Sequence, residues 1–343
     1  MPPAAGQAPV RPAANPVSFS GPSDNMRAKP IQQSEEYSQQ LQALVHSHSE
    51  LQKSGYVMHQ LSGPDLDRKR RCFQCGRRKQ DHTPKIYASG ELETEWLFYH
   101  TPPFGFGSQA AVAVVIDCEM GTASTGESEL IRVSAVDYFS GAVLLDSLVY
   151  PDVKMLHYNT RYSGVTRQGM ENARRMRSCI FGRASARRAL WSFVGPNTIV
   201  IGHSVNSDLT SLRWIHPVVV DTLIIEKRNR PPEENKKDKE DKDDMAQGED
   251  KQATQSPQGA ASDPQLKRSD GNSREEAVEK RPAKPRQRGG LSLKALAKER
   301  LARDIQVSGR GHDSVEDSIA TRDILHWNVL KLLEDQVQQA EAA

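Results

Sequence analysis

The sequence predicts an α/β fold in which helices cover a mixed central sheet. Two continuous apolar runs, residues 112–116 and 198–202, are typical of strands buried on both faces. Residues 130–138 and 142–150 are predicted as two further strands joined in a hairpin. Because strand and helix patterns alternate from residue 112 onward, we expect these strands to form one sheet within one layered domain.

Helical patterns follow the strands in the order that a covered sheet requires. Residues 184–194 carry apolar side chains on one side of a predicted helix, and a second helix follows the strand 198–202. Residues 217–222 supply a further short strand. The last helices begin near residues 291 and 314.

Composition divides the 343 residues into folded and unfolded parts. Residues 1–33 are rich in Pro, Ala, Ser and Gln, which predicts a disordered tail, and residues 34–63 suit a helical segment. A basic Cys/His segment spans residues 64–109, and the main domain spans residues 110–335. Residues 229–287 hold too few large apolar side chains to offset the entropy of ordering, so we interpret them as a disordered insertion within that domain.

Overall charge and composition exclude few functions. The chain has 46 Lys and Arg residues against 44 Asp and Glu residues, and a net charge of +2 is too small to indicate a nucleic-acid partner. No apolar run reaches the ~18 residues of a membrane span, and the N-terminus lacks the apolar core of a signal peptide. The four cysteines form no obvious disulfide framework, which favours a reducing compartment.

Carboxylates follow both buried strands. Asp117 and Glu119 are two residues apart, so in an extended chain both point to one face while Cys118 points to the other. Oxygen donors of this kind suit Mg²⁺ or Mn²⁺. Asp208 follows the strand 198–202, near the first turn of the next helix. The alternatives are solvated charge for the pair and a favourable helix-dipole interaction for Asp208.

A third acidic group begins the last helix. Asp313 and Glu316 fit a capping box, and Asp317 lies one turn inside, where an acid that faces the sheet needs compensation by a partner such as a metal. His312 precedes the helix, where its imidazole could reach a water molecule without binding the metal. A histidine before a helix usually has no special role, and only its spacing to Asp317 favours one.

Together these three groups resemble the DEDDh 3′–5′ exonuclease superfamily, which implies a ribonuclease H-like fold. Residues 158–166, 293–297 and 312–317 are similar to the eukaryotic RNA exonuclease (Rex-type) branch. The resemblance covers about residues 110–228 and 288–335. It implies five catalytic residues, namely Asp117, Glu119, Asp208, His312 and Asp317.

The resemblance also implies a two-metal mechanism with Mg²⁺ or Mn²⁺. Asp117, Glu119 and Asp317 would hold the ion that supports attack by water. Asp117, with Asp208 acting through water, would hold the ion that stabilises the leaving 3′ oxygen. His312 would take the proton of the attacking water as general base.

Nucleic-acid contacts are predicted beside this site. The resemblance implies that Met120 packs against the terminal base, with an ordinary core methionine as the alternative. Arg161 and the arginines that follow it suit a phosphate backbone, with a solvated helix face as the alternative. The arginines that follow are Arg167, Arg174, Arg175, Arg177, Arg183, Arg187 and Arg188.

The basic segment offers four potential zinc ligands: Cys72, Cys75, His82 and His100. Related exonucleases carry Cys-x-x-Cys followed by a Cys-x-x-His or Cys-x-His pair, and the corresponding cysteine is missing before His100. Two alternatives stay open: His82 substitutes for the missing ligand, or the site no longer binds zinc.

The leading hypothesis is a 3′–5′ exoribonuclease that shortens single-stranded RNA during RNA processing, in the nucleus, with the cytoplasm as the alternative location. The basic run at residues 280–286 is either a nuclear import signal or solvated charge. Two other hypotheses stay open: the same chemistry on DNA, and an RNA-binding scaffold that no longer cuts.

Overall fold

The structure, a computed structural model, describes residues 28–70, 89–104, 110–230, 290–307 and 311–342. In these ranges no helix combines the length and the apolar character that crossing a bilayer requires.

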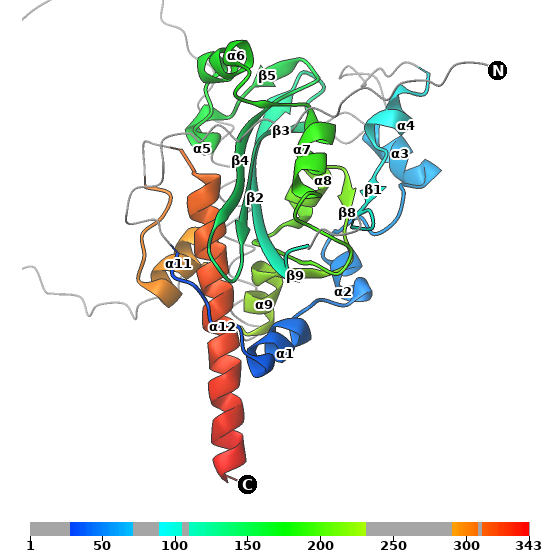
Figure 1. The fold of residues 1–343 in the computed structure, drawn as a ribbon. Coiled ribbons are helices and arrows are strands. Elements are labelled where there is room, and N and C mark those ends of the chain that lie inside the picture. Colours follow the sequence, from blue (N-terminus) through cyan, green and yellow to red (C-terminus); the bar gives the residue numbers. More distant parts are fainter. Residues whose placement is uncertain (1–27, 71–88, 105–109, 231–289, 308–310, 343) are drawn as a thin grey trace, which may run out of the picture.

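Within the described residues one mixed sheet forms the centre of the fold, and its seven strands are β2 (Ala113–Ala123), β3 (Ser128–Asp137), β4 (Val143–Tyr150), β5 (Met155–His157), β6 (Ile180–Phe181), β7 (Ile199–Gly202) and β9 (Val219–Asp221). The spatial order is β6-β4-β3-β2-β7-β9, with β5 paired to the end of β2 (Figure 1). β3 runs antiparallel to β2 and β4, whereas β7 is parallel to both β2 and β9. The predicted α/β fold, with a mixed central sheet flanked by helices, is confirmed.

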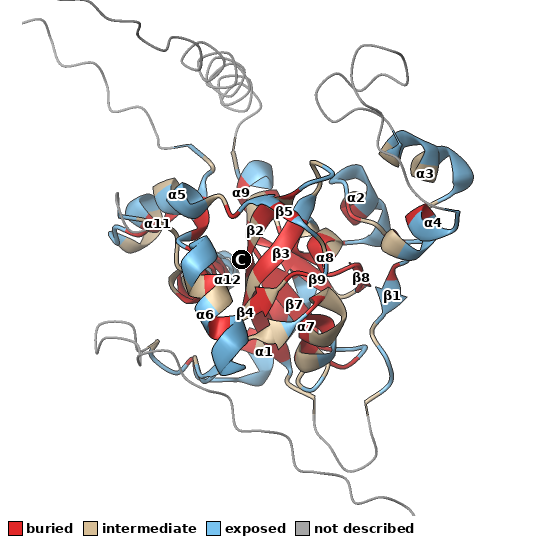
Figure 2. Cartoon of the chain, turned by 90° about the horizontal axis from the view of Figure 1, so that it is seen from above, coloured by how far each residue is buried: buried red, intermediate tan, exposed pale blue. Residues whose placement is uncertain are grey.

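Helices cover both faces of this sheet. The helices in the described residues are α1 (Glu35–Ala43), α2 (His48–Lys53), α3 (Gly63–Lys69), α4 (Glu91–Glu95), α5 (Thr160–Ser163), α6 (Arg167–Met176), α7 (Arg183–Leu190), α8 (Asn206–Ser211), α9 (Thr222–Arg228), α11 (Leu293–Leu301) and α12 (Ser314–Ala342). α7 and α8 pack on one face, and α1 and α12 pack on the other (Figure 1). Seen from above, the buried strands lie inside this shell of helices (Figure 2). A small second sheet joins β1 (Tyr99–His100) to β8 (Trp214–Ile215) in parallel.

Side chains along β2 alternate between the two halves of the core. Ile116 and Cys118 pack toward α7 and α8, and Val115 packs toward α1 and α12. Asp117 and Glu119 continue the series of Val115, since side chains two residues apart share a face of a strand. Both acids therefore face the side of the sheet on which α12 lies.

The strand that carries these acids is longer than predicted. The sequence predicts its end at residue 116, whereas β2 continues to Ala123 because β3 pairs with it along that length. On its other edge, pairing with β7 is recorded only as far as Val115 opposite Ile201. Asp117 and Glu119 thus lie beyond the end of the β2–β7 pairing, next to the carboxyl end of β7. In α/β sheets, ligands commonly bind just outside the carboxyl ends of the strands.

The N-terminal segment differs from its prediction in two respects. Residues 28–33, predicted as the end of a disordered tail, are placed against the sheet, where the Ile31 amide donates to the Phe139 carbonyl at 2.7 Å and the Ile31 side chain is buried. The predicted helical segment 34–63 contains two short helices and the start of a third. Ser47 caps the second of them by accepting from the Glu50 amide, so the chain turns rather than continuing one helix.

The boundaries of the main domain also shift. α12 runs on to Ala342, beyond the predicted end at residue 335, and its C-terminal part projects from the body (Figure 1). Asn229 and Arg230, predicted as the start of the insertion, belong to the folded part, where the Asn229 side chain donates to Asn328 at 3.3 Å. Residues 231–287 of the predicted insertion lie outside the described residues.

Candidate functional site

The structure brings four carboxylates together beside the open edge of β2. A carboxylate oxygen of Glu119, a ring nitrogen of His312 and a carboxylate oxygen of Asp317 lie within 4.8 Å of one another. Asp117 lies close enough to Asp208, Asp317 and Glu119 for all three to raise the pKa of its carboxyl. Three segments that are far apart in the chain, residues 117–119, 208 and 312–317, therefore meet at one place.

Asp208 reaches β2 through the backbone. Its Oδ1 accepts from the Cys118 amide at 2.7 Å, an amide that lies past the end of the β2–β7 pairing. Asp208 lies in the first turn of α8, as predicted, and is buried. This bond fixes the carboxylate beside the β2 acids.

Among the four acids, Asp317 has the surroundings that most clearly favour a bound cation. It lies in the first turn of α12 and is only 3% exposed. Its Oδ2 accepts from the Gln306 side chain at 2.8 Å, but within the described residues its buried Oδ1 has no hydrogen-bond partner. Because a buried, unpartnered carboxylate oxygen is costly, and because carboxylates are the donors that Mg²⁺ and Mn²⁺ prefer, the residues present fit a divalent cation.

His312 stands at the rim of this group. Its Nδ1 lies 3.9 Å from Asp317 Oδ2, and its side chain is 38% exposed. Burial, with a contribution from Lys294, lowers the pKa of His312 below 6.5. The imidazole is therefore mainly neutral at pH 7 and can accept a proton from the solvent side.

Three contacts hold the segment that carries His312. The His312 amide donates to the Tyr162 carbonyl at 2.5 Å. Gly311 packs so closely on Gly164 that an added Cβ would come within 2.4 Å of the Gly164 amide nitrogen. Arg132, the cross-strand neighbour of Glu119, donates to Asp313 at 3.2 Å. The α5 turn and the sheet thus seat the histidine together.

The carboxylates repel one another when no metal is bound. Burial raises the pKa of Glu119 to about 8, with Asp317 adding to the shift. Burial also raises the pKa of Asp208 to about 7, against the hydrogen bond from Cys118, and that of Asp317 to about 7. The pKa of Asp117 lies well above its ordinary value for the same reason. Divalent cations would relieve this repulsion.

A dependence of stability on pH and metal follows. Carboxyl pKa values near ~4 in the unfolded chain rise to about 7 or 8 for Asp208, Asp317 and Glu119, so the folded protein binds more protons and its stability falls as the pH rises through this range. Buried histidines such as His216, whose pKa burial lowers to about 4, oppose this trend only below ~6.5.

We therefore expect the melting temperature of EDTA-treated protein to fall between about pH 6.5 and about pH 8.5. At the upper pH, Mg²⁺ or Mn²⁺ at about 100 times its Kd should add about 2.7 kcal/mol, or about 5–10 °C. Thermal denaturation followed by circular dichroism measures both effects. A flat profile without metal, or no shift on adding either ion, would contradict the carboxylate cluster.

Two residues near the site could not be predicted from the sequence as neighbours of the carboxylates. Arg132 lies opposite Glu119 and also pairs with Asp146 at 2.9 Å, but strand register is invisible in the sequence. Gln306 lies in a loop and reaches Asp317 only after the chain has closed. In place of the predicted capping box, Asp313 accepts from the Val315 amide at 3.0 Å and Glu316 accepts from the Gln306 amide at 3.1 Å.

The predicted nucleic-acid contacts have mixed surroundings. Met120 is half-buried against the core, and its carbonyl accepts from Asn159 at 3.1 Å. Arg161 is exposed, with its guanidinium 5.7 Å from the centre of the Tyr162 ring, which in turn meets the His312 ring edge-on at 6.4 Å. Both lie near the site, and their roles stay predictions.

Two arginines of the predicted backbone-binding stretch serve the fold instead. Arg183 pairs with Glu95 and with buried Glu129, and Arg187 is buried and donates to the Leu212 carbonyl at 2.7 Å. Their position in α7, which packs on the sheet, turns these charges inward. The prediction of a phosphate contact is therefore wrong for both.

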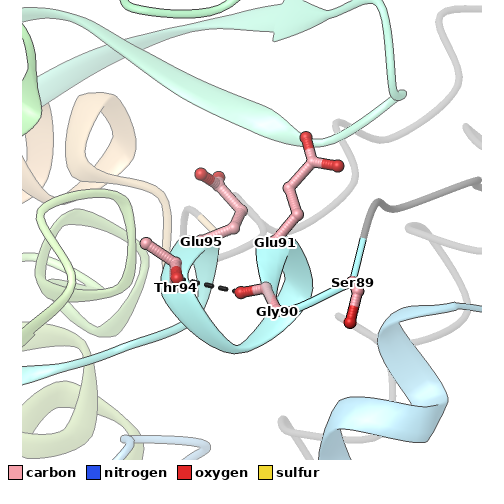
Figure 3. A pocket seen from close by; sticks show the side chains of 5 residues that line it. All are labelled: Ser89, Gly90, Glu91, Thr94 and Glu95. Atoms are coloured by element: carbon pink, nitrogen blue, oxygen red, sulfur yellow. Dashed lines mark hydrogen bonds between the residues drawn. The ribbon is translucent and has the colours of Figure 1, made fainter.

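Of the four predicted zinc ligands, His100 alone lies in the described residues. Cys72, Cys75 and His82 lie outside them, and His100 is exposed in β1. A hollow of about 430 Å³ lies nearby, lined by Ser89, Gly90, Glu91, Thr94 and Glu95 (Figure 3). Its Glu95 already pairs with Arg183 and Arg213, so we assign no site to it.

Curated proteins similar to this chain are exonucleases. An RNA exonuclease 3 of Emericella nidulans is 29% identical over 64% of this chain and 30% of its own length. An uncharacterized exonuclease of Schizosaccharomyces pombe is 30% identical over 67% and 26%, and the human interferon-stimulated 20 kDa exonuclease-like 2 is 30% identical over 62% and 44%. The chain thus spans less than half of the length of each relative. No family model matches it.

Among solved structures, the Neurospora crassa Pan2 catalytic unit is similar to this chain at a TM-score of 0.43 and 17% identity. The alignment covers 73% of this chain and 34% of the Pan2 chain. That likeness is too remote to carry a conclusion.

Proposed function

Because the chain belongs to the DEDD-type exonuclease family, we propose that it is a metal-dependent 3′–5′ exoribonuclease acting on single-stranded RNA. The observation that carries the proposal is the meeting of Glu119, His312 and Asp317 beside Asp117 and Asp208, with one buried Asp317 oxygen that no other described residue partners. Relatives named RNA exonuclease 3 and, in Arabidopsis thaliana, small RNA degrading nuclease 3 support RNA as the substrate.

Each residue has a role in this proposal. Asp117, Glu119 and Asp317 would hold one Mg²⁺ or Mn²⁺ and Asp117 and Asp208 a second, and bound ions of this kind neutralise phosphate charge and make water more acidic. His312, neutral at pH 7 and partly exposed, would accept the proton of the attacking water. The hydrogen bond from its amide to Tyr162 and the bond from Arg132 to Asp313 limit its movement, which suits a base that must meet one water molecule.

The location and the choice of nucleic acid belong to the same proposal. We favour a role in RNA processing in the nucleus; the basic run at residues 280–286 supports it only as a sequence pattern. DNA-directed cutting and a scaffold without activity are the competing functions. They differ in what the protein does to matched RNA and DNA strands.

The test uses 5′-labelled RNA and DNA of the same sequence with Mg²⁺ or Mn²⁺. We expect the wild type to shorten RNA stepwise from the 3′ end and faster than DNA, and Asp117→Asn to leave both intact. Faster shortening of DNA would favour the DNA-directed function. RNA that is bound but never shortened, whichever metal is supplied, would favour the scaffold.

A further inference from the structure

We propose that Gln306 is a positioning residue that orients the Asp317 carboxylate toward a divalent cation. The inference rests on the proposed function only in taking Asp317 as a metal ligand. The Gln306 Nε2 donates to Asp317 Oδ2 at 2.8 Å, while the buried Oδ1 of the same carboxylate has no hydrogen-bond partner in the part of the chain that the structure describes. One oxygen is thus fixed and the other kept for a ligand.

The backbone of Gln306 is held on both sides. Its amide donates to Glu316 at 3.1 Å, and its carbonyl accepts from the Lys294 ammonium at 2.8 Å. Ile305, the residue before it, is fully buried in the cluster between α11 and α12. Two helices and a small core therefore determine where the Gln306 amide points.

The backbone conformation of Gln306 is unfavourable for a residue with a side chain. Its φ is +52°, in the left-handed region where glycine is the ordinary choice. A strained conformation persists only where the surroundings over-determine it, and such residues gather at functional sites. At Gln306 the unfavourable φ occurs together with the hydrogen bond from its side-chain amide to Asp317.

The chemistry of glutamine suits this position. Its amide donates a hydrogen bond without a positive charge, so it can orient Asp317 without neutralising it. A lysine or arginine would compete with the cation for the carboxylate. Partners that orient metal ligands in this way typically change metal affinity about 10- to 100-fold when they are removed.

The experiment separates orientation of Asp317 from simple closure of the loop. Gln306→Met keeps the length of the side chain and the backbone bonds but removes the donor. Gln306→Gly removes the donor and also relieves the strained φ. Ala302→Gly is the matched control, because Ala302 ends α11 with the same φ of +52° and is exposed. The measurement is Mn²⁺ binding by calorimetry without RNA, together with melting temperatures in EDTA.

We expect both Gln306 variants to bind Mn²⁺ about 10-fold more weakly than the wild type, with Ala302→Gly unchanged. In EDTA, Gln306→Gly should melt higher than Gln306→Met, because both variants lose the donor to Asp317 and only the glycine also relieves the left-handed φ. RNA shortening by the variants should recover at saturating Mn²⁺, since the metal ligand itself is intact.

The outcomes also distinguish this inference from the proposed function. Equal Mn²⁺ affinity in the wild type and both Gln306 variants would overturn the inference while RNA shortening could still stand. A wild type that binds Mn²⁺ but shortens nothing, with both variants weakened, would support the inference and overturn the function. A wild type that does not bind Mn²⁺ would overturn both.

Discussion

Asp208→Asn is expected to lower the rate of RNA shortening by about 100-fold or more while leaving the protein folded. Asparagine keeps a carbonyl oxygen that can accept from the Cys118 amide, as Asp208 Oδ1 does at 2.7 Å. It loses the negative charge that would hold a cation, and metal stabilisation of a phosphoryl-transfer transition state is worth several kcal/mol. Single-turnover rates on 5′-labelled RNA measure the loss.

The same substitution should stabilise the protein when metal is absent. At about pH 8 in EDTA, Asp208→Asn removes a buried charge, since burial raises the pKa of Asp208 to about 7, and it also removes one of the charges that raise the pKa of Asp117, so the melting temperature should rise. The rise on adding Mg²⁺ should shrink in parallel. A substitution that lowers activity while raising the melting temperature indicates a charge that serves function at the expense of stability.

Asp221→Asn is the contrasting control. Asp221 ends the neighbouring strand β9 and is also buried, but its oxygens accept from the Ser204 and Leu223 amides and from the Tyr56 hydroxyl. We expect this variant to melt lower than the wild type and to keep its rate per folded molecule. An Asp208→Asn protein that cuts normally would remove Asp208 from the site.

Gly311→Ala is expected to lower kcat about 100-fold with little change in RNA binding measured in EDTA. The added Cβ would come within 2.4 Å of the Gly164 amide nitrogen and 2.5 Å of its Cα. These are backbone atoms and cannot swing aside, so the segment that carries His312 must shift. A displacement of about 1 Å of a catalytic group can cost about 100-fold in rate.

Gly90→Ala isolates the backbone cost of that change. Gly90 has a φ of +78°, close to the +75° of Gly311, but a Cβ there meets no atom within 4 Å. Both variants should therefore lose stability through the unfavourable φ, with an additional loss for Gly311→Ala from the contact with Gly164, and only Gly311→Ala should lose kcat. Equal rates for the two variants would show that the contact with Gly164 does not seat His312.

The candidate site was foreseeable where it depends on local backbone geometry. Asp117 and Glu119 share a face because side chains alternate along any strand, and Asp317 faces the sheet because it lies one turn inside a helix that packs there. The five residues named from the resemblance also meet in space, although their catalytic roles stay predictions. Arg183 and Arg187 show the limit, since a run of arginines does not reveal which of them turn inward.

By itself, the sequence determined the α/β fold class, the strands that lead to the acids and the chemical kind of the donors, because side-chain period and apolar runs are local properties. The tertiary structure decided the rest. It extended β2 past its predicted end through pairing with β3, placed Arg132 opposite Glu119 by strand register, and pressed Gly311 on Gly164. It also turned Gln306 onto Asp317, because contacts between distant segments form only when the sheet and α12 have packed together.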